Sequence, residues 1–295
     1  MKTIVIHHSA DFDGLFCREI ARKFLPDAEL IGWDYGDPVP VVPHTTPLYI
    51  LDLSIDGLMD HPLLTWIDHH KSAIDKFPGT IPGYRIDGVA ACRLAWQWFA
   101  GFQSHGGTVV DLPTKAEFIE RTVNEPLAVR LAGEYDIWDK RDPDADTFQF
   151  ALRASSLTEH VWNCLLDPTT EQILQVQQSQ IMACALMPAG AAVQRYQKQL
   201  DESTAKNRSF DLEWEGKKFL AINATRCNSA TFEAACRLDH DGLLGFYWNG
   251  KEWTVSLYHS PAHKEHDLSQ IAVKYGGGGH RGACGFRASK LSFIP

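Results

Sequence analysis

Three short apolar runs near the start of the chain each end in aspartate or histidine. The clearest is the run L-T-W-I at positions 64–67, which stops at Asp68, His69 and His70. Two similar runs precede it: I-V-I at 4–6 is followed by His7, His8, Asp11 and Asp13, and L-Y-I-L at 48–51 is followed by Asp52. Such runs are typical of buried parallel strands, whose carboxyl ends meet at one edge of a sheet and bind ligands there. Burying so many charged groups is costly unless they bind a cation, so the sequence predicts a metal site at this edge.

The spacing of apolar residues around these runs predicts an α/β first domain. The segment from Leu15 to about Pro26 has helical periodicity, and Gly14 permits a tight turn before it. Further expected elements are strands at 29–33, 48–52 and 64–68, a helical turn at 56–61, and helices at 88–101, 114–123 and 125–134. Strands that alternate with helices favour a parallel sheet with helices on both faces.

The pattern changes in the second half of the chain. Residues 156–207 look helical and increasingly polar, which is typical of a solvated helix that connects two domains. Strands are then expected around 210–223, 243–248 and 253–259, and a helix capped by Asp267 through Val273. We therefore expect a catalytic domain at 1–190, a helical linker to about 208, and a smaller α+β substrate-binding domain at 209–295.

Composition and charge restrict the class of protein. The 295 residues carry a formal net charge of −9, which argues against a grip on long duplex nucleic acid but allows a short anionic substrate. No apolar run approaches the ~20 residues that span a bilayer, and histidine at positions 7 and 8 comes too early for a signal peptide. Seven cysteines without a C-x-x-C pair are typical of reduced thiols. We therefore expect a cytoplasmic protein with no membrane partner, and a homodimer is left open.

The first histidine and aspartate cluster points to a particular class of metal. His7, Asp11 and Asp13 place one nitrogen and two oxygen ligands on one strand-to-helix loop, which suits Mn²⁺, Mg²⁺ or Fe²⁺ better than a thiolate zinc site. Alone, D-x-D-G fits a calcium loop or a plain turn about as well, and a single aspartate such as Asp52 is usually a cap. Because three strand ends carry such groups, the functional interpretation is favoured.

A second informative stretch is Y-G-G-G-G-H-R-G-A-C-G-F at 275–286. The glycines Gly276, Gly277, Gly278 and Gly279 let backbone N–H groups approach an anion, and His280 and Arg281 add donors suited to phosphate. The alternative is a flexible linker, but a linker would not lead directly into the strand-like A-C-G-F. We interpret this stretch as a phosphate-binding segment.

In combination these motifs resemble the DHH/DHHA1 phosphoesterases, and among them the oligoribonucleases (nano-RNases), over nearly the whole chain. The D-H-H triplet at 68–70 gives the family its name. His7-x-x-x-Asp11-x-Asp13 looks like the first motif of the family and Asp52 like the second. Gly276–Gly279 with His280 looks like its glycine-rich motif. A further motif of the family is an aspartate late in the catalytic domain. Asp136 is the best match to that late aspartate, and Asp139 is a poorer one.

The resemblance implies a hydrolase with two Mn²⁺ ions, with Mg²⁺ or Fe²⁺ as alternatives. By position, the ligands would be His7, Asp11, Asp13, Asp52, His69 and Asp136, with Asp13 or Asp52 as the bridge. His70 would face the substrate phosphate, and Asp68 would orient its neighbours rather than bind metal. The spacing of four residues before Asp11 favours His7 over His8 as the ligand, although the choice is left open, and His8 would contact phosphate or be structural. Two metals ~3.5–4 Å apart can activate a water in line with phosphorus without a protein nucleophile.

The function expected from this two-metal site is hydrolysis of short oligonucleotides or small nucleotides to mononucleotides from an end, as an exonuclease does. The second domain would clamp the terminal nucleotide. One alternative is hydrolysis of pyrophosphate or polyphosphate at the same site, and another is a non-catalytic nucleotide sensor, which the full ligand set argues against. Trp138, Trp248 and Tyr258 could stack a base, but core packing is the favoured role of each.

Overall fold

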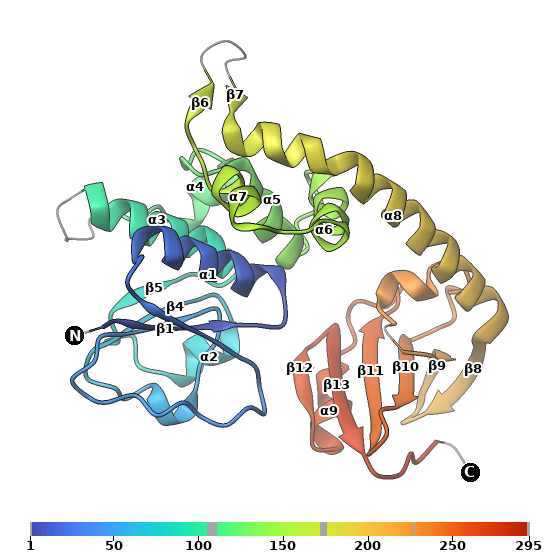
Figure 1. Ribbon diagram of the computed structural model, residues 1–295. Coiled ribbons are helices and arrows are strands. Elements are labelled where there is room, and N and C mark those ends of the chain that lie inside the picture. The colour runs from blue at the N-terminus through green and yellow to red at the C-terminus, as the bar shows by residue number, and fades with distance from the viewer. Residues whose placement is uncertain (1, 105–110, 172–175, 226, 294–295) are drawn as a thin grey trace. The chain divides into compact units, whose positions relative to one another are not determined.

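The computed structural model describes residues 2–104, 111–171, 176–225 and 227–293. Contacts between residues divide the chain into two compact units, Met1–Val193 and Gln194–Pro295. The division falls inside the long helix α8 (Gln178–Arg208), which is labelled with the other elements in Figure 1. Each unit is described separately below.

The first unit is built on a five-stranded sheet in the order β2-β1-β3-β4-β5, and every neighbouring pair is parallel. Its strands are β1 (Ile4–His8), β2 (Glu29–Trp33), β3 (Leu48–Leu51), β4 (Leu64–Asp68) and β5 (Gly83–Arg85). The predicted parallel α/β fold is therefore confirmed. β5 is the one strand of this sheet that the sequence pattern did not indicate.

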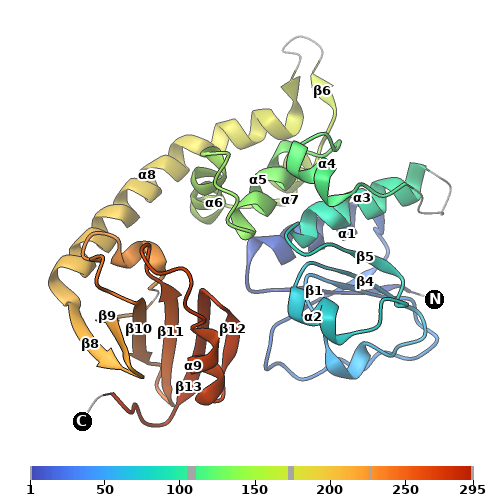
Figure 2. The ribbon, with the colours of Figure 1, turned by 180° about the vertical axis from the view of Figure 1, so that it is seen from behind.

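Both faces of this sheet are covered by apolar residues, which explains why the strands read as continuous apolar runs. Val5, Leu51 and Ile67 pack into a core with helices α1 (Phe12–Phe24) and α3 (Ala91–Ser104). Ile6, Ile50 and Trp66 belong to a second core on the other face, with Ala73 of α2 (Lys71–Lys76). In both ribbon views α1 and α3 lie on one face of the sheet and α2 on the other (Figures 1 and 2).

Further helical elements complete the first unit: the short turn η1 (Asp56–Leu58), then α4 (Lys115–Glu120), α5 (Leu127–Asp136), α6 (Asp144–Ala154) and α7 (Glu159–Leu165). The sequence pattern did not indicate α6. The continuous helix expected over 156–207 is wrong, because a strand pair, β6 (Thr170–Glu171) and β7 (Val176–Gln177), separates α7 from α8. Pro168 lacks an N–H to continue α7, and the Asp167 carboxylate accepts the Thr169 N–H in a turn instead.

The second unit contains a six-stranded sheet in the order β12-β13-β11-β10-β9-β8. Its elements are β8 (Ser209–Trp214), β9 (Lys217–Asn223), the turn η2 (Ser229–Phe232), β10 (Gly242–Trp248), β11 (Trp253–His259), α9 (Ser269–Lys274), β12 (Gly278–His280) and β13 (Ala283–Ala288). Only β9 and β10 pair in parallel, so the sheet is mixed, as expected for an α+β domain. Phe219, Leu257 and Ala272 of α9 lie in its core. Leu268, not Asp267, is the N-cap of α9, although the Asp267 carboxylate accepts the Ser269 N–H.

Over the described residues, none of the helices is both long enough and apolar enough to cross a bilayer.

Candidate metal centre

The predicted acidic and histidine side chains gather at one edge of the parallel sheet in the first unit. β1, β3 and β4 are adjacent and parallel, so their carboxyl ends place His8, Asp52 and His69 at the same edge. The N-terminal turn of α1 adds Asp11, its N-cap, and Asp13, while the last residue of α5 adds Asp136. The strand order therefore explains why residues far apart in the sequence meet here.

One cluster consists of His8, Asp11 and Asp52. The distance from His8 Nδ1 to Asp11 Oδ2 is 3.0 Å, and that from His8 Nδ1 to Asp52 Oδ2 is 3.5 Å. One ligand atom from each of the three residues lies within 4.8 Å of the others. His8 Nε2 lies 3.4 Å from Asp34 Oδ1, and this second carboxylate orients the imidazole ring.

A second cluster consists of Asp13, His69 and Asp136. His69 Nε2 lies 3.5 Å from Asp13 Oδ2 and 3.3 Å from Asp136 Oδ2. The same nitrogen lies 3.4 Å from Asp52 Oδ1. Asp52 therefore directs one oxygen toward each cluster.

The environment of Asp52 fits a bound cation. Asp52 is 1% exposed, and neither carboxylate oxygen accepts a hydrogen bond from any residue that the structure describes. Its backbone has a φ of 63°, a left-handed conformation that costs energy in a residue other than glycine and is often found at functional sites. Buried carboxylate oxygens that lack donors, next to imidazole nitrogens, are the ligands expected for Mn²⁺, Mg²⁺ or Fe²⁺.

The pKa values at this edge also indicate an excess of buried negative charge. Burial, with repulsion by the Asp52 carboxylate, raises the pKa of Asp13 to about 7. Burial, with repulsion by Asp13, raises the pKa of Asp136 to about 7. Although burial opposes it, the neighbouring carboxylates of Asp11 and Asp52 raise the pKa of His8 to about 11. A cation can replace the protons that these groups would otherwise retain.

Comparison with solved structures supports the fold assignment. RecJ from Thermus thermophilus, solved in complex with Mn²⁺, superposes with a TM-score of 0.50 at 14% identity, covering 99% of this chain and 50% of RecJ. The DHH domain of PF0399, a member of a family of ribosomal proteins, gives a TM-score of 0.50 at 12% identity, covering 97% of this chain and 82% of that one. The chain has the DHH fold. The predicted resemblance to DHH phosphoesterases is thus confirmed at the level of the fold.

A pGpG-specific phosphodiesterase, PggH from Vibrio cholerae, gives a TM-score of 0.48 at 14% identity, covering 98% of this chain and 94% of PggH. No protein-family profile and no curated protein sequence matches the chain.

In the triplet at 68–70, the Asp68 carboxylate holds the two histidines that follow it. The Asp68 side chain is fully buried, and its Oδ1 accepts the N–H groups of His69 and His70 at 2.7 and 3.1 Å. Asp68 Oδ1 also lies 2.7 Å from His70 Nδ1. When Nδ1 donates this hydrogen bond, the His70 ring is fixed in orientation and its Nε2 is left for another partner. One possible ligand atom of His70 also lies within 4.8 Å of ligand atoms of Asp52 and His69.

The structure places the adjacent residues His7, which the spacing favoured as the ligand, and His8 in different surroundings. Successive side chains of a strand point to opposite faces, and only His8 joins the clusters with Asp11 and Asp52. The His7 ring lies beside β2, where a Cβ built on Gly32 would be 3.5 Å from His7 Nε2. His7 Nδ1 donates to the His8 carbonyl at 2.8 Å, and burial lowers the pKa of His7 to about 4. The neutral His7 ring is therefore part of the packing around β1.

Asp13 has a structural contact that its sequence position did not indicate. Its two carboxylate oxygens accept the N–H groups of Ala91 and Cys92 at 2.9 and 2.7 Å. Ala91 is the first residue of α3, so Asp13 supplies acceptors for N–H groups that the helix itself cannot pair. The Asp13 side chain thus links α1 to α3 and is also part of the second cluster.

The glycine-rich segment of the second unit forms a tight hairpin rather than an open loop. A Cβ on Gly277 would lie 2.0 Å from the Gly285 carbonyl oxygen, and one on Gly279 would lie 2.7 Å from Cys284 Cα. Close packing against β13 therefore explains these two glycines. A Cβ built on Gly276 or Gly278 would meet no atom within 4 Å. The segment lines a pocket of about 640 Å³. His280 and Arg281 are exposed beside it, and phosphate binding by this segment stays a prediction.

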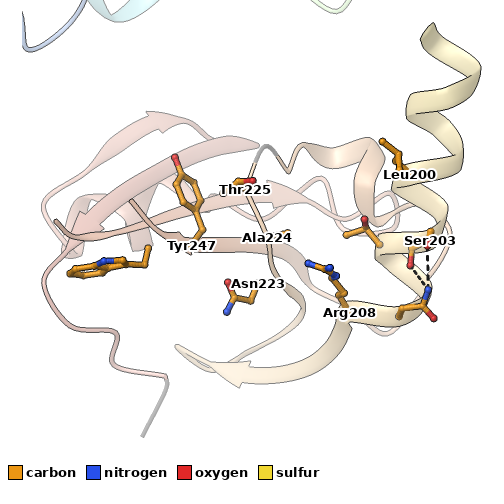
Figure 3. A pocket seen from close by; sticks show the side chains of 10 residues that line it. Leu200, Ser203, Arg208, Asn223, Ala224, Thr225 and Tyr247 are labelled. Atoms are coloured by element: carbon orange, nitrogen blue, oxygen red, sulfur yellow. Dashed lines mark hydrogen bonds between the residues drawn. The ribbon is translucent and has the colours of Figure 1, made fainter. Parts of the chain in front are cut away.

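Another pocket of the second unit, of about 750 Å³, lies between the end of α8 and the ends of β9 and β10. Figure 3 shows Arg208, Asn223 and Tyr247 around it. Among the described residues that line it there is no carboxylate or imidazole, and the one residue singled out in the sequence analysis is Trp248.

Two of the three aromatic residues expected in the core are exposed instead. Trp138 is 61% exposed and Trp248 is 48% exposed, so core packing is wrong for both, whereas Tyr258 is partly buried. Trp138 follows α5 with a φ of 57° and lies two residues after Asp136. Its ring stacks on that of Tyr135 at a centroid distance of 6.4 Å, and Lys140 Nζ lies 4.5 Å from the indole.

The metal-free protein is expected to lose stability as the pH rises above about 6.5. The pKa of His8 is raised to about 11 and that of His69 to about 10, from 6.5 in the unfolded chain. Such groups stabilise the fold fully below the unfolded pKa, and the contribution is lost as the pH rises toward the folded value. Urea unfolding with chelator at about pH 6.5, 7.5 and 8.5 measures this change. A free energy of unfolding that stays constant or increases over this range would contradict it.

Proposed function

We propose that this chain is a metal-dependent phosphodiesterase that hydrolyses short oligonucleotides or small nucleotides to mononucleotides. The observation that carries the proposal is the Asp52 carboxylate, which is buried, accepts no hydrogen bond from a described residue, and lies between two histidine and aspartate clusters. Two clusters that share one carboxylate suit a pair of divalent cations.

The residues of each cluster have separate roles in this proposal. His8, Asp11 and Asp52 hold one cation, while Asp13, His69 and Asp136 hold the other with the help of Asp52. When bound, the cation pair supplies Lewis-acid activation of water and neutralises charge on the phosphate. His70, oriented by Asp68, presents Nε2 to a phosphate oxygen. No serine, threonine or cysteine nucleophile is needed, so the protein positions the substrate and the attacking water.

Mn²⁺ is the ion that we propose for this site. A set of carboxylates with two imidazoles suits Mn²⁺, Fe²⁺ and Mg²⁺, and the RecJ structure with the same fold is a complex with Mn²⁺. Imidazole ligands favour Mn²⁺ or Fe²⁺ over Mg²⁺, which prefers oxygen and retains its waters.

A small substrate fits the charge and the surface near the site. The net charge of −9 disfavours the long contacts with phosphates that extended nucleic acid needs. Trp138, exposed two residues after Asp136 and flanked by Lys140, offers an aromatic surface for one base. In the second unit, the glycine-rich segment with His280 and Arg281 is the proposed contact for a terminal phosphate.

A product assay with chelator-treated protein tests this function. The substrates are an RNA dinucleotide, bis-nitrophenyl phosphate and pyrophosphate, each without metal, with Mn²⁺ and with Mg²⁺. We expect Mn²⁺-dependent conversion of the dinucleotide to mononucleotides. Turnover of pyrophosphate alone would instead identify a phosphoanhydride hydrolase, and bound metal with no turnover of any substrate would favour a nucleotide sensor.

Replacement of His8 by alanine is expected to weaken Mn²⁺ binding by at least about tenfold, because it removes one nitrogen ligand. The matched control is His7→Ala, next to it on β1, which leaves Mn²⁺ affinity close to that of the parent protein. Mn²⁺ titration by calorimetry measures both affinities. A larger loss in His7→Ala than in His8→Ala would reverse the assignment of the ligand.

Replacement of Trp138 by alanine is expected to raise KM for a dinucleotide by about 5- to 150-fold, since stacking of one base on an aromatic ring is worth ~1–3 kcal/mol. KM for pyrophosphate, which has no base, should not change. Trp248→Ala is the control, because it removes an exposed tryptophan from the second unit. Equal KM values for the dinucleotide in Trp138→Ala and the parent protein would exclude this stacking surface.

A further inference from the structure

A cluster of possible metal ligands lies in the second unit and belongs to none of the motifs discussed above. Asp241 lies just before β10, and His263 and His266 lie in the loop between β11 and α9. One ligand atom from each lies within 4.8 Å of the others. We propose that Asp241, His263 and His266 bind a structural divalent cation of the Zn²⁺ class. This proposal is independent of the function proposed for the first unit.

The distances within the cluster fit ligands of a single tetrahedral ion. Asp241 Oδ1 lies 3.2 Å from His266 Nε2, and two ligands at ~2.1 Å from a tetrahedral ion lie roughly 3.4 Å apart. The rings of His263 and His266 have centroids 5.5 Å apart, whereas two imidazoles on one such ion lie roughly 5 Å apart. Only a small adjustment of side chains is needed to close the site.

His263 gives a second and separate indication of a cation. Its Nε2 lies 3.0 Å from the Leu238 carbonyl oxygen, and its Nδ1 lies 3.0 Å from Glu265 Oε1. Both neighbours are acceptors, but a neutral imidazole has only one N–H to donate. The ring therefore requires either a second proton or a cation on Nδ1, and one of its two nitrogens lies within 4.8 Å of ligand atoms of Asp241 and His266. Donation of Nε2–H to a backbone carbonyl is the usual way in which a metal-binding histidine is oriented.

The carboxylate of Asp241 is held in place in the same way. Its Oδ2 accepts the Lys218 N–H at 2.7 Å, and its own N–H donates to the Lys218 carbonyl at 2.7 Å. Oδ1 is left for His266 and the ion. The side chains of Lys218 and Arg237 are paired with Asp211 and Asp239, so these neighbouring positive charges are already balanced.

A cation here would link Asp241 to the loop after β11, two segments that the pairing of Gly242 with His259 already brings side by side. The loop at 260–267 precedes α9, and Arg281 donates to the Glu265 carbonyl at 3.1 Å. Leu268 N–H donates to the Arg281 carbonyl at 3.0 Å. Binding between this loop and Asp241 would therefore restrict the backbone beside the glycine-rich hairpin. Two nitrogens with a carboxylate favour Zn²⁺, unlike the more oxygen-rich centre of the first unit.

The test uses the full chain, without an affinity tag, carrying Asp52→Asn and His69→Ala to disable the centre of the first unit. Zn²⁺ binding is measured by competition with a chromophoric chelator near neutral pH, together with the shift in Tm that Zn²⁺ produces. We expect one Zn²⁺ per chain and a Zn²⁺-dependent increase in Tm. His263→Ala, or separately Asp241→Asn, should weaken Zn²⁺ affinity by about 100-fold and remove the Tm increase.

The control is Lys264→Ala, which changes the same loop without removing a ligand and should bind Zn²⁺ like its parent. Absence of stoichiometric Zn²⁺ binding in the parent would overturn the proposal and leave a doubly protonated His263 as the explanation. Unchanged Zn²⁺ affinity in both His263→Ala and Asp241→Asn would also overturn it. Because the first centre is disabled throughout, neither result depends on the phosphodiesterase activity.

Discussion

Replacement of Asp52 by asparagine is expected to abolish phosphodiester hydrolysis while leaving the fold almost as stable as that of the parent protein. Asp52 is the carboxylate shared by both clusters, so its loss weakens both proposed cation sites at once. Its two oxygens accept no hydrogen bond from the described residues, so the substitution removes none of the bonds that hold the fold. Asparagine also tolerates the left-handed backbone found at this position.

The expected loss in kcat/KM is at least about a thousandfold, comparable to removal of a principal electrostatic contact from an active site. The free energy of unfolding of the metal-free variant should stay within about 1 kcal/mol of the parent, because repulsion of Asp13 and attraction of the histidines by Asp52 are lost together. Steady-state kinetics and urea unfolding with chelator measure these two quantities. Retained turnover would contradict the shared role of Asp52.

The control for this experiment is Asp139→Asn, which tests the weaker match to the late aspartate motif. The Asp139 carboxylate pairs with the Arg141 guanidinium, and the hydrogen bonds from Arg141 lower the pKa of Asp139 to about 2. Asp139 is absent from the groups of nearby ligand atoms found among the described residues. We expect Asp139→Asn to retain most of the activity. A greater loss in Asp139→Asn than in Asp136→Asn would show that the wrong aspartate has been assigned.

The meeting of these acidic and histidine side chains at one edge could be predicted because it depends on a simple rule of parallel sheets. The apolar runs at 4–6, 48–51 and 64–67 identified the strands, and parallel connection placed the residues after them at one edge. The choice between His7 and His8 could not be made in this way, because both residues end the same strand. It depends on which face each side chain occupies: His8 lies beside Asp11, whereas the His7 ring lies beside Gly32.

Other features depend on contacts between distant segments and leave little trace in local pattern. Asp241 precedes β10, whereas His263 and His266 follow β11, so these three residues form no short motif in the sequence. The glycine run suggested a phosphate loop, but Gly277 and Gly279 are explained by close packing against β13. A glycine in the sequence indicates that a side chain is not tolerated there, but only the tertiary structure shows which atoms lie close to it.

Replacement of Asp13 by alanine is expected to lower both activity and stability, in contrast to Asp52→Asn. The Asp13 side chain is 2% exposed and accepts the first two N–H groups of α3, from Ala91 and Cys92, 78 and 79 residues away in the sequence. Removing the carboxylate leaves two buried donors without their acceptor. Each such loss costs about 1–3 kcal/mol, so we expect a decrease of about 2–4 kcal/mol in the free energy of unfolding.

The decrease should be partly offset, because ionised Asp13 is itself repelled by Asp52, as its raised pKa of about 7 indicates. His69→Ala is the matched comparison, since it removes a proposed ligand of the same cluster, whose Nε2 faces the carboxylates of Asp13, Asp52 and Asp136. Both variants should lose Mn²⁺-dependent turnover, but only Asp13→Ala should unfold at a clearly lower urea concentration. Equal urea midpoints for the two metal-free variants would mean that α3 does not depend on Asp13, and that the role of this carboxylate is limited to the metal centre.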